Sequence, residues 1–361
     1  MHELRLLDIQ KKYKDKEAVR KFNYTFTNGV YGLLGENGAG KTTLMRLICG
    51  VLQPTGGSIY CDNIEIVSMG AEYRKLLGYL PQDFGYYGDF TAERFLRYMA
   101  ALKALPEDYA NSRIDELLDM VELKNVKKKK LKTYSGGMIR RIGIAQALLN
   151  NPEILILDEP TSFLDVRYKL EFLTILKDLV REKQIAVILS LHELDLAQRI
   201  SDVVLCIRNH TVDRIGTPDE IFTDAYITNL YGITCGSYES LYGTMELPAP
   251  TGTPQTFVIG GGGTGNAVYR QLQRENIPFY AGVLQENDLD YPVAKALATE
   301  VVAEKAFEPI GESAFQKASS LLQHCEQVIL CCKQFGAMNQ KNQELVSLAK
   351  ENGKQILEAN S

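Results

Sequence analysis

Short apolar runs recur along the chain, separated by segments in which apolar residues have helical spacing. The runs cover residues 30–34, 77–80, 154–157 and 185–189, and polar residues or glycines bound each of them. A continuous apolar run of this length is typical of a strand that is buried on both faces of a parallel sheet. We therefore predict an α/β fold in which strands alternate with helices.

Two longer segments show clear periodicities of their own. Residues 3–35 alternate apolar and polar positions around an Asn28-Gly29 turn, which predicts strands joined by turns. Residues 91–125 carry apolar side chains at helical spacing, namely Leu96, Met99, Leu102, Ile114, Leu117, Leu118 and Val121. We expect helices there.

In the C-terminal part of the chain, the sequence patterns predict shorter elements and a linker. Residues 203–215 indicate a hairpin, and residues 217–231 indicate short helices. Residues 243–255 are rich in Pro, Gly and Thr and predict a linker. Strands are then expected at 256–259, before a helix, and at 279–284.

These signals predict two domains. The first covers residues 1–242 and includes a helical region at about 84–133, and the second covers residues 256–361 after the linker. We expect the second domain to be a small Rossmann-like α/β domain. A chain of 361 residues is long enough for each domain to bury a core of its own.

The composition narrows the classes of partner and compartment. The chain has 40 Lys and Arg against 45 Asp and Glu, a mildly acidic balance that argues against a nucleic-acid partner. Its apolar runs are too short to cross a bilayer, and its first residues lack the apolar core of a signal peptide. The seven cysteines are scattered without a Cys-x-x-Cys motif, so we expect reduced thiols and a cytoplasmic protein.

The strongest chemical signal lies at residues 35–43, directly after the first apolar run. The segment has the P-loop pattern of a glycine, four residues and then Gly-Lys-Thr. Glycines let backbone N–H groups approach phosphate oxygens, and the N-terminus of the following helix favours an anion. Lys41 can reach the β- and γ-phosphates, and the Thr42 hydroxyl can ligate Mg²⁺. The sequence predicts a site for a nucleoside triphosphate.

Two carboxylates, Asp158 and Glu159, end the apolar run at 154–157. Open α/β sheets bind their ligands at the carboxyl ends of such strands. Asp158 suits the Mg²⁺ shell, and Glu159 can orient and polarise an attacking water. The alternative, two solvated turn residues, is disfavoured because the same chain carries a P-loop.

Several other positions are ambiguous when each is considered alone. Gln82 and His192 follow strands, where a side chain is often only solvated or structural. Ser135 precedes two glycines at a helix start, where it either caps the helix or faces a phosphate. Tyr13 offers a ring that could stack on adenine, although a surface tyrosine often has no such role.

Residues 260–265 carry the G-x-G-x-x-G spacing of dinucleotide-binding folds, after a strand and before a helix. Glu286 follows the next strand, about 20 residues on, where an acid could meet a ribose. Four consecutive glycines satisfy many patterns, so the signal is weak. Nucleotide binding and a Rossmann-like packing or regulatory module both remain open.

Taken together and in this order, the motifs of residues 1–240 resemble those of the ATP-binding subunit of ABC transporters. By resemblance, Gln82 is the Q-loop glutamine, Ser162 to Asp165 form the D-loop, and Glu159 and His192 are the catalytic carboxylate and the switch histidine. The ATP-binding residues that it implies are Tyr13, Gly35, Asn37, Gly38, Gly40, Lys41, Thr42, Thr43 and the signature residues Ser135, Gly136 and Gly137. The metal-binding residues that it implies are Thr42, Gln82 and Asp158.

The signature departs from its usual form at two positions. Tyr134 stands where leucine is usual, and Met138 stands where glutamine is usual. The serine and the glycines that face phosphate are intact, so the resemblance still implies ATP and Mg²⁺ as ligands.

The resemblance also implies a fold and partners. It implies a P-loop NTPase with a RecA-like core, an antiparallel β subdomain and a helical subdomain. Two copies would form a head-to-tail homodimer around two ATP molecules, with Ser135 and Gly137 completing the partner's site. The dimer would lie at the cytoplasmic face of the cell membrane, where integral permease subunits dock on the helical subdomain.

The two parts of the chain resemble different transport systems. Residues 1–160 look like ATPases of ABC-2-type exporters, whereas the chain from Pro160 onward, with its C-terminal extension, looks like ATPases of iron(III)-siderophore and corrinoid importers. We expect import, with a substrate-binding protein in the complex, and keep an ABC-2-type exporter as the alternative. A soluble ABC ATPase outside transport is a second alternative, although such proteins usually carry two nucleotide domains or a long coiled-coil insertion. An oxidoreductase built on residues 260–265 is disfavoured, because no catalytic partner is obvious near that loop.

Overall fold

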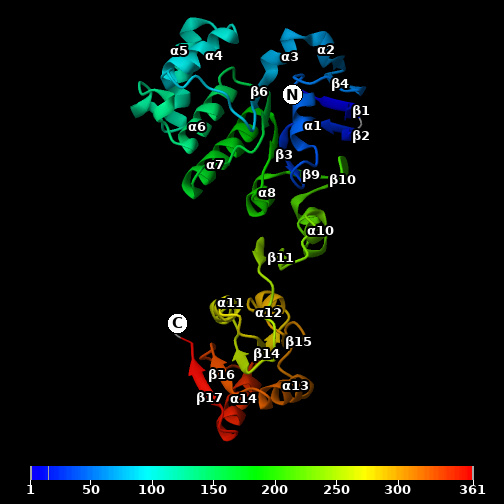
Figure 1. Ribbon diagram of the computed structural model, residues 1–361, viewed down its shortest axis with the longest axis vertical. Coiled ribbons are helices and arrows are strands. Elements are labelled where there is room, and N and C mark those ends of the chain that lie inside the picture. The colour runs from blue at the N-terminus through cyan, green and yellow to red at the C-terminus, as the bar shows by residue number, and fades with distance from the viewer. Residues whose placement is uncertain (1, 15, 360–361) are drawn as a thin grey trace. The chain divides into compact units, whose positions relative to one another are not determined.

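The computed structural model describes residues 2–14 and 16–359, which form two compact units (Figure 1). Unit 1 comprises Met1–Phe222, and unit 2 comprises Thr223–Ser361. The sequence predicts that the first domain ends at residue 242. Residues 223–242 instead belong to unit 2.

A six-stranded sheet forms the centre of unit 1, in the order β10-β9-β3-β8-β7-β6. Its strands are β3 (Gly29–Leu34), β6 (Leu77–Leu80), β7 (Ile154–Leu157), β8 (Ala186–Ser190), β9 (Val203–Arg208) and β10 (Thr211–Gly216). All of them pair in parallel except β10, which is antiparallel to β9. Every residue of β3, β7 and β8 is buried, as the apolar runs predicted. The parallel pairing places the segments that follow β3, β6, β7 and β8 at one edge of the sheet.

A second, antiparallel sheet has the order β2-β1-β4-β5. Its strands are β1 (Leu4–Tyr13), β2 (Lys16–Phe26), β4 (Gly56–Cys61) and β5 (Ile64–Glu65). One apolar core cluster joins this sheet to the six-stranded sheet and to α1 (Lys41–Ile48), through residues such as Leu6, Met45 and Ile156. The helix that follows the P-loop is therefore held by the cores of both sheets.

Helices complete unit 1. They are α2 (Ile66–Met69), α3 (Ala71–Leu76), α4 (Ala92–Leu102), α5 (Glu107–Met120), α6 (Gly136–Ala147), α7 (Val166–Lys183), α8 (Leu194–Ile200) and α9 (Pro218–Ile221), with 3₁₀ turns at Lys124–Val126 and Leu131–Thr133. Figure 1 shows α4 and α5, in cyan, beside α6, and both contact it. Thr91 caps α4 by accepting a hydrogen bond from the Arg94 backbone N–H at 3.2 Å. Of these elements, α4, α5 and the two 3₁₀ turns lie in the region at about 84–133 for which the sequence predicts a helical subdomain.

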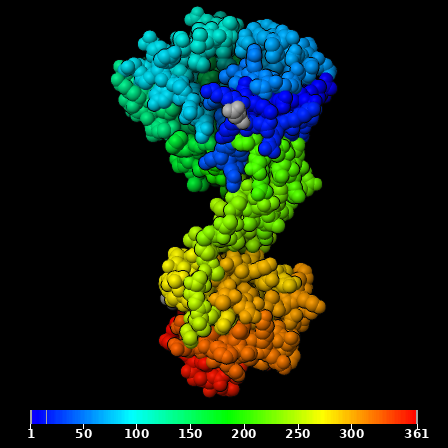
Figure 2. All heavy atoms as spheres, turned by 45° about the vertical axis from the view of Figure 1, so that its right-hand side comes forward, coloured from blue at the N-terminus to red at the C-terminus, as the bar shows by residue number. Residues whose placement is uncertain are grey.

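Unit 2 is built on a five-stranded parallel sheet in the order β15-β14-β13-β16-β17. Its elements are β13 (Thr256–Ile259), α11 (Asn266–Arg274), β14 (Phe279–Gln285), α12 (Tyr291–Leu297), β15 (Glu300–Glu304), α13 (Glu312–Gln323), β16 (Gln327–Leu330), α14 (Gln340–Glu351) and β17 (Gln355–Glu358). The order reverses between β13 and β16, as at the switch point of a Rossmann sheet. Phe257 and Val258 point to opposite faces and enter separate core clusters. In Figure 2 the atoms of this part of the chain, yellow to red, form one compact body.

A short antiparallel pair precedes this sheet within unit 2. β11 (Ser237–Glu239) pairs with β12 (Thr244–Glu246), after α10 (Asp224–Leu230). The predicted linker at 243–255 therefore begins with a paired strand. Glu246 is also buried and accepts a hydrogen bond from Nε of Arg270 on α11 at 3.1 Å.

Within the described residues, no helix has the length and apolar character that crossing a bilayer would require.

Candidate functional site

The loop that follows β3 needs glycine at two positions where it passes close to other backbone. A Cβ on Gly35 would lie 2.1 Å from the carbonyl oxygen of Ile207, and one on Gly40 would lie 2.4 Å from that of Ala18. Both glycines also have positive φ, 142° and 116°, which side chains rarely adopt. These two glycines let the loop turn tightly, so that its backbone N–H groups can face an anion at the start of α1.

A cleft of about 340 Å³ lies beside this loop. Its lining residues are Asn37, Gly38, Gly40, Lys41, Thr42, Thr43, Gln82, Glu159 and His192. They come from the loop, from the start of α1 and from the segments after β6, β7 and β8. The structure therefore brings together residues from four of the motifs that the sequence analysis singled out.

Lys41 is only 6% exposed, and its ammonium binds the loop to which it belongs. Nζ donates to the carbonyl oxygens of Gly35 at 2.6 Å and Glu36 at 3.0 Å. Burial lowers the pKa of Lys41, although the carboxylates of Asp158 and Glu159 oppose that shift. A partly desolvated ammonium of this kind is a strong donor to phosphate oxygens.

Three other side chains form hydrogen bonds with the Glu159 carboxylate. Oε1 accepts hydrogen bonds from Nε2 of Gln82 at 3.1 Å and from His192 Nε2 at 2.6 Å. Oε2 accepts one from the Ser162 hydroxyl at 3.4 Å. The side chain is 15% exposed, so it keeps one open side toward the cleft. The Q-loop, the D-loop and the switch segment thus meet on one carboxylate.

Asp158 is 1% exposed, and one of its two carboxylate oxygens accepts a hydrogen bond. Its Oδ1 accepts a hydrogen bond from the Ser190 hydroxyl at 2.8 Å, and Ser190 also accepts one from the Glu159 backbone N–H at 2.9 Å. Among the described residues Asp158 Oδ2 has no hydrogen-bond partner. A buried acceptor without a partner fits a hydrated cation such as Mg²⁺. The sequence analysis missed Ser190, whose signal is a polar residue at the end of an otherwise apolar strand.

Arg140 of α6 is a second residue that the sequence analysis missed. Its Nη1 donates to the carbonyl oxygens of Pro81 at 2.8 Å and Gln82 at 3.1 Å, and its Nη2 donates to those of Glu159 at 2.7 Å and of Asp158. The side chain is 4% exposed. Burial lowers the pKa of the guanidinium, although both carboxylates oppose the shift. Local sequence does not distinguish Arg140 from Arg141, because its partners are distant in the chain.

Glu193 connects the switch segment to the helix after the D-loop. Its carboxylate accepts hydrogen bonds from the Thr161 hydroxyl at 2.9 Å and from Lys169 Nζ on α7 at 2.6 Å. Burial acts to raise the pKa of Glu193, but these hydrogen bonds outweigh it and hold the pKa below the usual 4.5. This ion pair restrains the backbone next to His192.

The signature residues and Tyr13 are not among the residues that line the cleft. Ser135 caps α6 by accepting a hydrogen bond from the Met138 N–H at 3.3 Å. A Cβ on Gly137 would lie 2.8 Å from the carbonyl oxygen of Phe163, whose side chain is 83% exposed. Tyr13 ends β1 and is 46% exposed. A single chain therefore supplies only part of the predicted ATP contacts at its own cleft.

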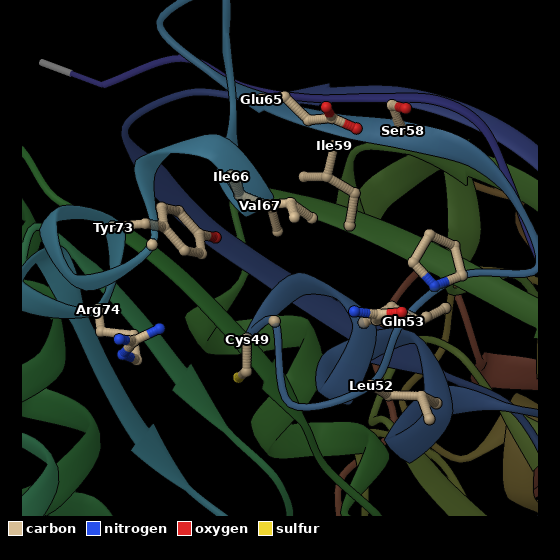
Figure 3. A pocket seen from close by; sticks show the side chains of 14 residues that line it. Cys49, Leu52, Gln53, Ser58, Ile59, Glu65, Ile66, Val67, Tyr73 and Arg74 are labelled. Atoms are coloured by element: carbon tan, nitrogen blue, oxygen red, sulfur yellow. The ribbon is translucent and has the colours of Figure 1, made fainter.

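Two of the hollows among the described residues of unit 1 lie away from the phosphate-binding loop. One, of about 220 Å³, opens between the end of α1 and β4, α2 and α3, with Ile59, Ile66 and Tyr73 around it (Figure 3). Tyr73 closes one side and donates a hydrogen bond from its hydroxyl to the Ile48 carbonyl oxygen at 2.8 Å. The other, a groove of about 350 Å³, runs beside Phe84 and Met99.

The glycine-rich loop of unit 2 is already bonded to carboxylates of its own chain. Asp290 accepts hydrogen bonds from the backbone N–H groups of Gly261 at 2.7 Å, Gly265 at 2.8 Å and Asn266 at 3.1 Å. Asp288 accepts from the Gly262 N–H at 2.9 Å with both oxygens. Asp290 is fully buried. These are the donors that a dinucleotide phosphate would need, so the geometry does not favour phosphate binding here.

A cleft of about 600 Å³ nevertheless lies at this edge of the unit 2 sheet. Asp288, Cys331 and Asn342 are among its lining residues, whereas Glu286, the predicted ribose partner, is exposed and is not one of them. Of the two interpretations left open for this loop, the geometry therefore favours a Rossmann-like packing or regulatory module over dinucleotide binding.

Comparisons with known proteins agree with the motif set. The sequence profile of the family described as ABC transporter matches residues 19–162. The profile of the MJ0874 family matches residues 279–360, within unit 2.

Three relatives extend the likeness over most of the chain. An uncharacterized ABC transporter ATP-binding protein of Bacillus subtilis is 36% identical over 244 residues, 67% of this chain and 79% of that protein. A zinc import ATP-binding protein of Rickettsia prowazekii is 32% identical over 226 residues, 62% of this chain and 89% of that protein. An uncharacterized ABC transporter ATP-binding protein of Methanocaldococcus jannaschii is 30% identical over 283 residues, 75% of this chain and 96% of that protein. This last match is longer than unit 1, so it extends into unit 2.

Among solved structures, a dimeric structure of the ATP-binding cassette MJ0796, in a post-hydrolysis state bound to ADP and phosphate, has the same fold as unit 1. The TM-score is 0.56 at 26% sequence identity, and the match covers 60% of this chain and 98% of that one.

Proposed function

The chain belongs to the ATP-binding proteins of ABC transporters, and from this premise we propose how its cleft hydrolyses ATP and what the hydrolysis drives. As a member of this family it binds and hydrolyses ATP. The observation that carries our assignment of roles is the convergence of Gln82 and His192 on Oε1 of Glu159. Glu159 polarises the attacking water, and the two partners orient its carboxylate and sense the γ-phosphate.

When ATP binds, phosphate oxygens replace backbone carbonyl oxygens as the acceptors of the Lys41 ammonium. The ammonium now donates to two neutral carbonyl oxygens, and phosphate oxygens are stronger acceptors because they carry charge. Thr42, Gln82 and Asp158 would hold Mg²⁺, which would supply positive charge beside the phosphates of ATP. The unpartnered Oδ2 of Asp158 supports its part in that set.

We propose that two copies form a head-to-tail homodimer around two ATP molecules. Ser135 and Gly137 then complete the partner's site, since the N-terminus of α6 favours the γ-phosphate charge. Phe163, Val166 and Leu170 are all more than half exposed on the segment from the D-loop into α7. An exposed apolar surface next to the signature fits a face that is covered in the dimer. The related cassette was solved as a dimer, which supports the proposal.

Permease subunits dock on the helical subdomain in this proposal. The groove beside α4 is lined by Phe84, Gly85 and Met99, next to the Q-loop, and Tyr86 and Tyr87 are exposed close by. An apolar groove with aromatic residues suits a short amphipathic helix of a membrane partner. Its position next to Gln82 would let docking and hydrolysis influence each other. The protein would accordingly work as a peripheral protein at the cytoplasmic face of the membrane.

For the direction of transport, we propose import of an iron(III)-siderophore or a corrinoid. A relative that is named for zinc import supports import, and the resemblance of the C-terminal part to importer ATPases supports the cargo class. An ABC-2-type exporter remains the alternative, because residues 85–91 resemble exporter ATPases. A non-transport ABC ATPase is the second alternative.

Capture from membranes discriminates these proposals. Full-length Glu159→Gln protein, loaded with ATP, is used to isolate partners from detergent-solubilised native membranes, with Lys41→Ala as the control that cannot form the ATP dimer. A many-helix permease of the siderophore or corrinoid type supports import, and a six-helix ABC-2 permease contradicts it. Recovery of no permease with Glu159→Gln, while the wild-type protein hydrolyses ATP normally, favours the non-transport alternative.

A further inference from the structure

Helix α6 carries functional groups at two places along its length. Ser135 caps its N-terminus within the signature, and Arg140 follows in the second turn. Five residues of α-helix rise about 7.5 Å, so the two groups are separated by little more than one turn. The Ile139 N–H donates to the Ser135 carbonyl oxygen at 2.9 Å, which continues the helical hydrogen bonding to the cap. The cap and Arg140 therefore belong to one continuous stretch of helical hydrogen bonding.

Arg140 in turn holds the backbone at the ends of two strands. One guanidinium nitrogen binds the carbonyl oxygens of Pro81 and Gln82 after β6, and the other binds those of Asp158 and Glu159 after β7. These are the backbone positions of the Q-loop glutamine and the catalytic carboxylate. Four carbonyl oxygens around one buried cation form a charge-assisted set of bonds that is costly to break.

A second contact packs α6 against the end of β6. A Cβ on Gly143 would lie 2.6 Å from Leu80 Cδ1 and 3.2 Å from Phe84. The helix therefore packs directly on the end of β6 and the Q-loop, one turn after Arg140. Two independent contacts thus hold α6 against the Q-loop.

We propose that Arg140 is a positioning residue that links the two ATP sites of the dimer. The proposal rests on the head-to-tail dimer described above. In that dimer Ser135 faces the ATP on the partner's P-loop, whereas Arg140 positions Gln82 and Glu159 at the P-loop of its own chain. Movement of α6 when one site closes on ATP thus adjusts the catalytic carboxylate of the other site.

The geometry requires arginine rather than any cation. The planar guanidinium presents donors in a fixed fork and can serve two strand ends at once. A lysine ammonium is a single point of charge on a flexible stem, and it cannot hold both pairs of carbonyl oxygens in one geometry. Arg140→Lys therefore preserves charge while it removes the link.

The first measurement separates binding from turnover in the full-length protein. We expect Arg140→Lys to leave KM for ATP near the wild-type value, because the P-loop is untouched. A small misplacement of Glu159 should lower kcat by roughly 100-fold. The Hill coefficient for ATP should fall toward 1.

Mixed dimers test the link between sites directly. One subunit carries Glu159→Gln, so that only the partner's site turns over, and Arg140→Lys is added to either subunit. If Arg140 links the sites, turnover falls in both placements. If Arg140 acts only on its own chain's site, turnover stays at the control rate when Arg140→Lys shares the subunit with Glu159→Gln, and the proposal is overturned.

Arg141 provides a matched control on the same helix. Its Nη1 binds the Val121 carbonyl oxygen at 3.0 Å, and its guanidinium carbon lies 3.8 Å from the Tyr168 ring centroid, so it contacts α5 and α7. Arg141→Lys should leave turnover unchanged in both placements. If Arg140→Lys does not fold, Gly143→Ala disturbs the same contact from the other side and should again lower turnover in both placements.

The outcomes distinguish failure of the link between the two ATP sites from failure of the head-to-tail dimer on which the link rests. Absence of an ATP-dependent dimer in the Glu159→Gln protein overturns the head-to-tail dimer itself. Normal ATP-dependent dimerisation, with turnover affected only when Arg140→Lys lies beside the working Glu159, overturns the link between sites alone.

Discussion

Nε2 of His192 lies 2.6 Å from Oε1 of Glu159, the oxygen that also accepts the Gln82 amide at 3.1 Å. The segments that follow β6, β7 and β8 thus share one carboxylate oxygen. An oxygen that already accepts two hydrogen bonds is a weaker base for a water molecule. Entry of a γ-phosphate that competes for His192 would free this oxygen for its catalytic role.

His192→Ala should lower kcat by roughly 100-fold, because the site loses the side chain that senses the γ-phosphate and orients the Glu159 carboxylate. KM for ATP should change little, because the P-loop contacts remain. Phosphate release under saturating ATP measures the effect, and His324→Ala, at an exposed position at the end of α13, serves as the control. Near-normal turnover of His192→Ala would return this histidine to a structural role.

Lys41→Ala should weaken ATP binding by roughly 100-fold, because a buried ammonium that can meet phosphate oxygens is lost. Equilibrium titration with a fluorescent ATP analogue measures this change. Lys75→Ala removes an exposed lysine that pairs with Glu72 on α3 and should bind as the wild type does. Undiminished affinity in Lys41→Ala would refute the assignment of the P-loop.

The full-length protein should bind no NAD at micromolar concentrations. The amide donors of the glycine-rich loop in unit 2 are already satisfied by Asp288 and Asp290, and a pyrophosphate would have to displace these carboxylates. Isothermal titration of the Lys41→Ala protein with NAD measures binding without interference from the P-loop site. Saturable micromolar binding would contradict the prediction and restore the nucleotide interpretation of unit 2.

Glu193 should contribute to stability above pH 4.5 and lose that contribution in acid. Its pKa is lower in the folded protein than the usual 4.5, so folding favours the carboxylate, and the gain disappears as the pH falls through the folded pKa. Glu193→Gln should lower the free energy of unfolding at pH 7 by about 1 kcal/mol or less, because the pair with Lys169 is partly exposed.

Thermal unfolding at pH 7 and near pH 4 checks this difference. The deficit of Glu193→Gln should shrink at the lower pH, whereas an unchanged deficit would assign its cause to packing.

The central strands and the main motifs of unit 1 could be predicted because their signals are local. Runs such as 154–157 are buried on both faces of the sheet, and the residues after them line one cleft. Arg140 and Ser190 escaped prediction because their roles arise from contacts across long sequence separations. Arg140 reaches Pro81 and Gln82 because α6 packs on β6, which lies far from it in the sequence.

Two features of unit 2 could not be predicted from the sequence, and each has a physical cause. Composition at 243–255 indicated a loop but did not reveal that β12 pairs with β11, which places residues 223–242 in unit 2. The glycine pattern at 260–265 gave the correct strand, loop and helix. It could not reveal that Asp288 and Asp290, from the segment after β14, would take up the donors of the loop.

The pairing of β11 with β12 determines where this chain can be divided. The guanidinium of Arg270 on α11 pairs with the Glu246 carboxylate, so a fragment that begins at residue 256 lacks the carboxylate that this cation binds. A fragment that begins at residue 243 keeps Glu246 but separates β12 from its partner strand. If domains are exchanged between genes, a segment that begins at Thr223 keeps both the β11–β12 pair and the contact between Glu246 and Arg270.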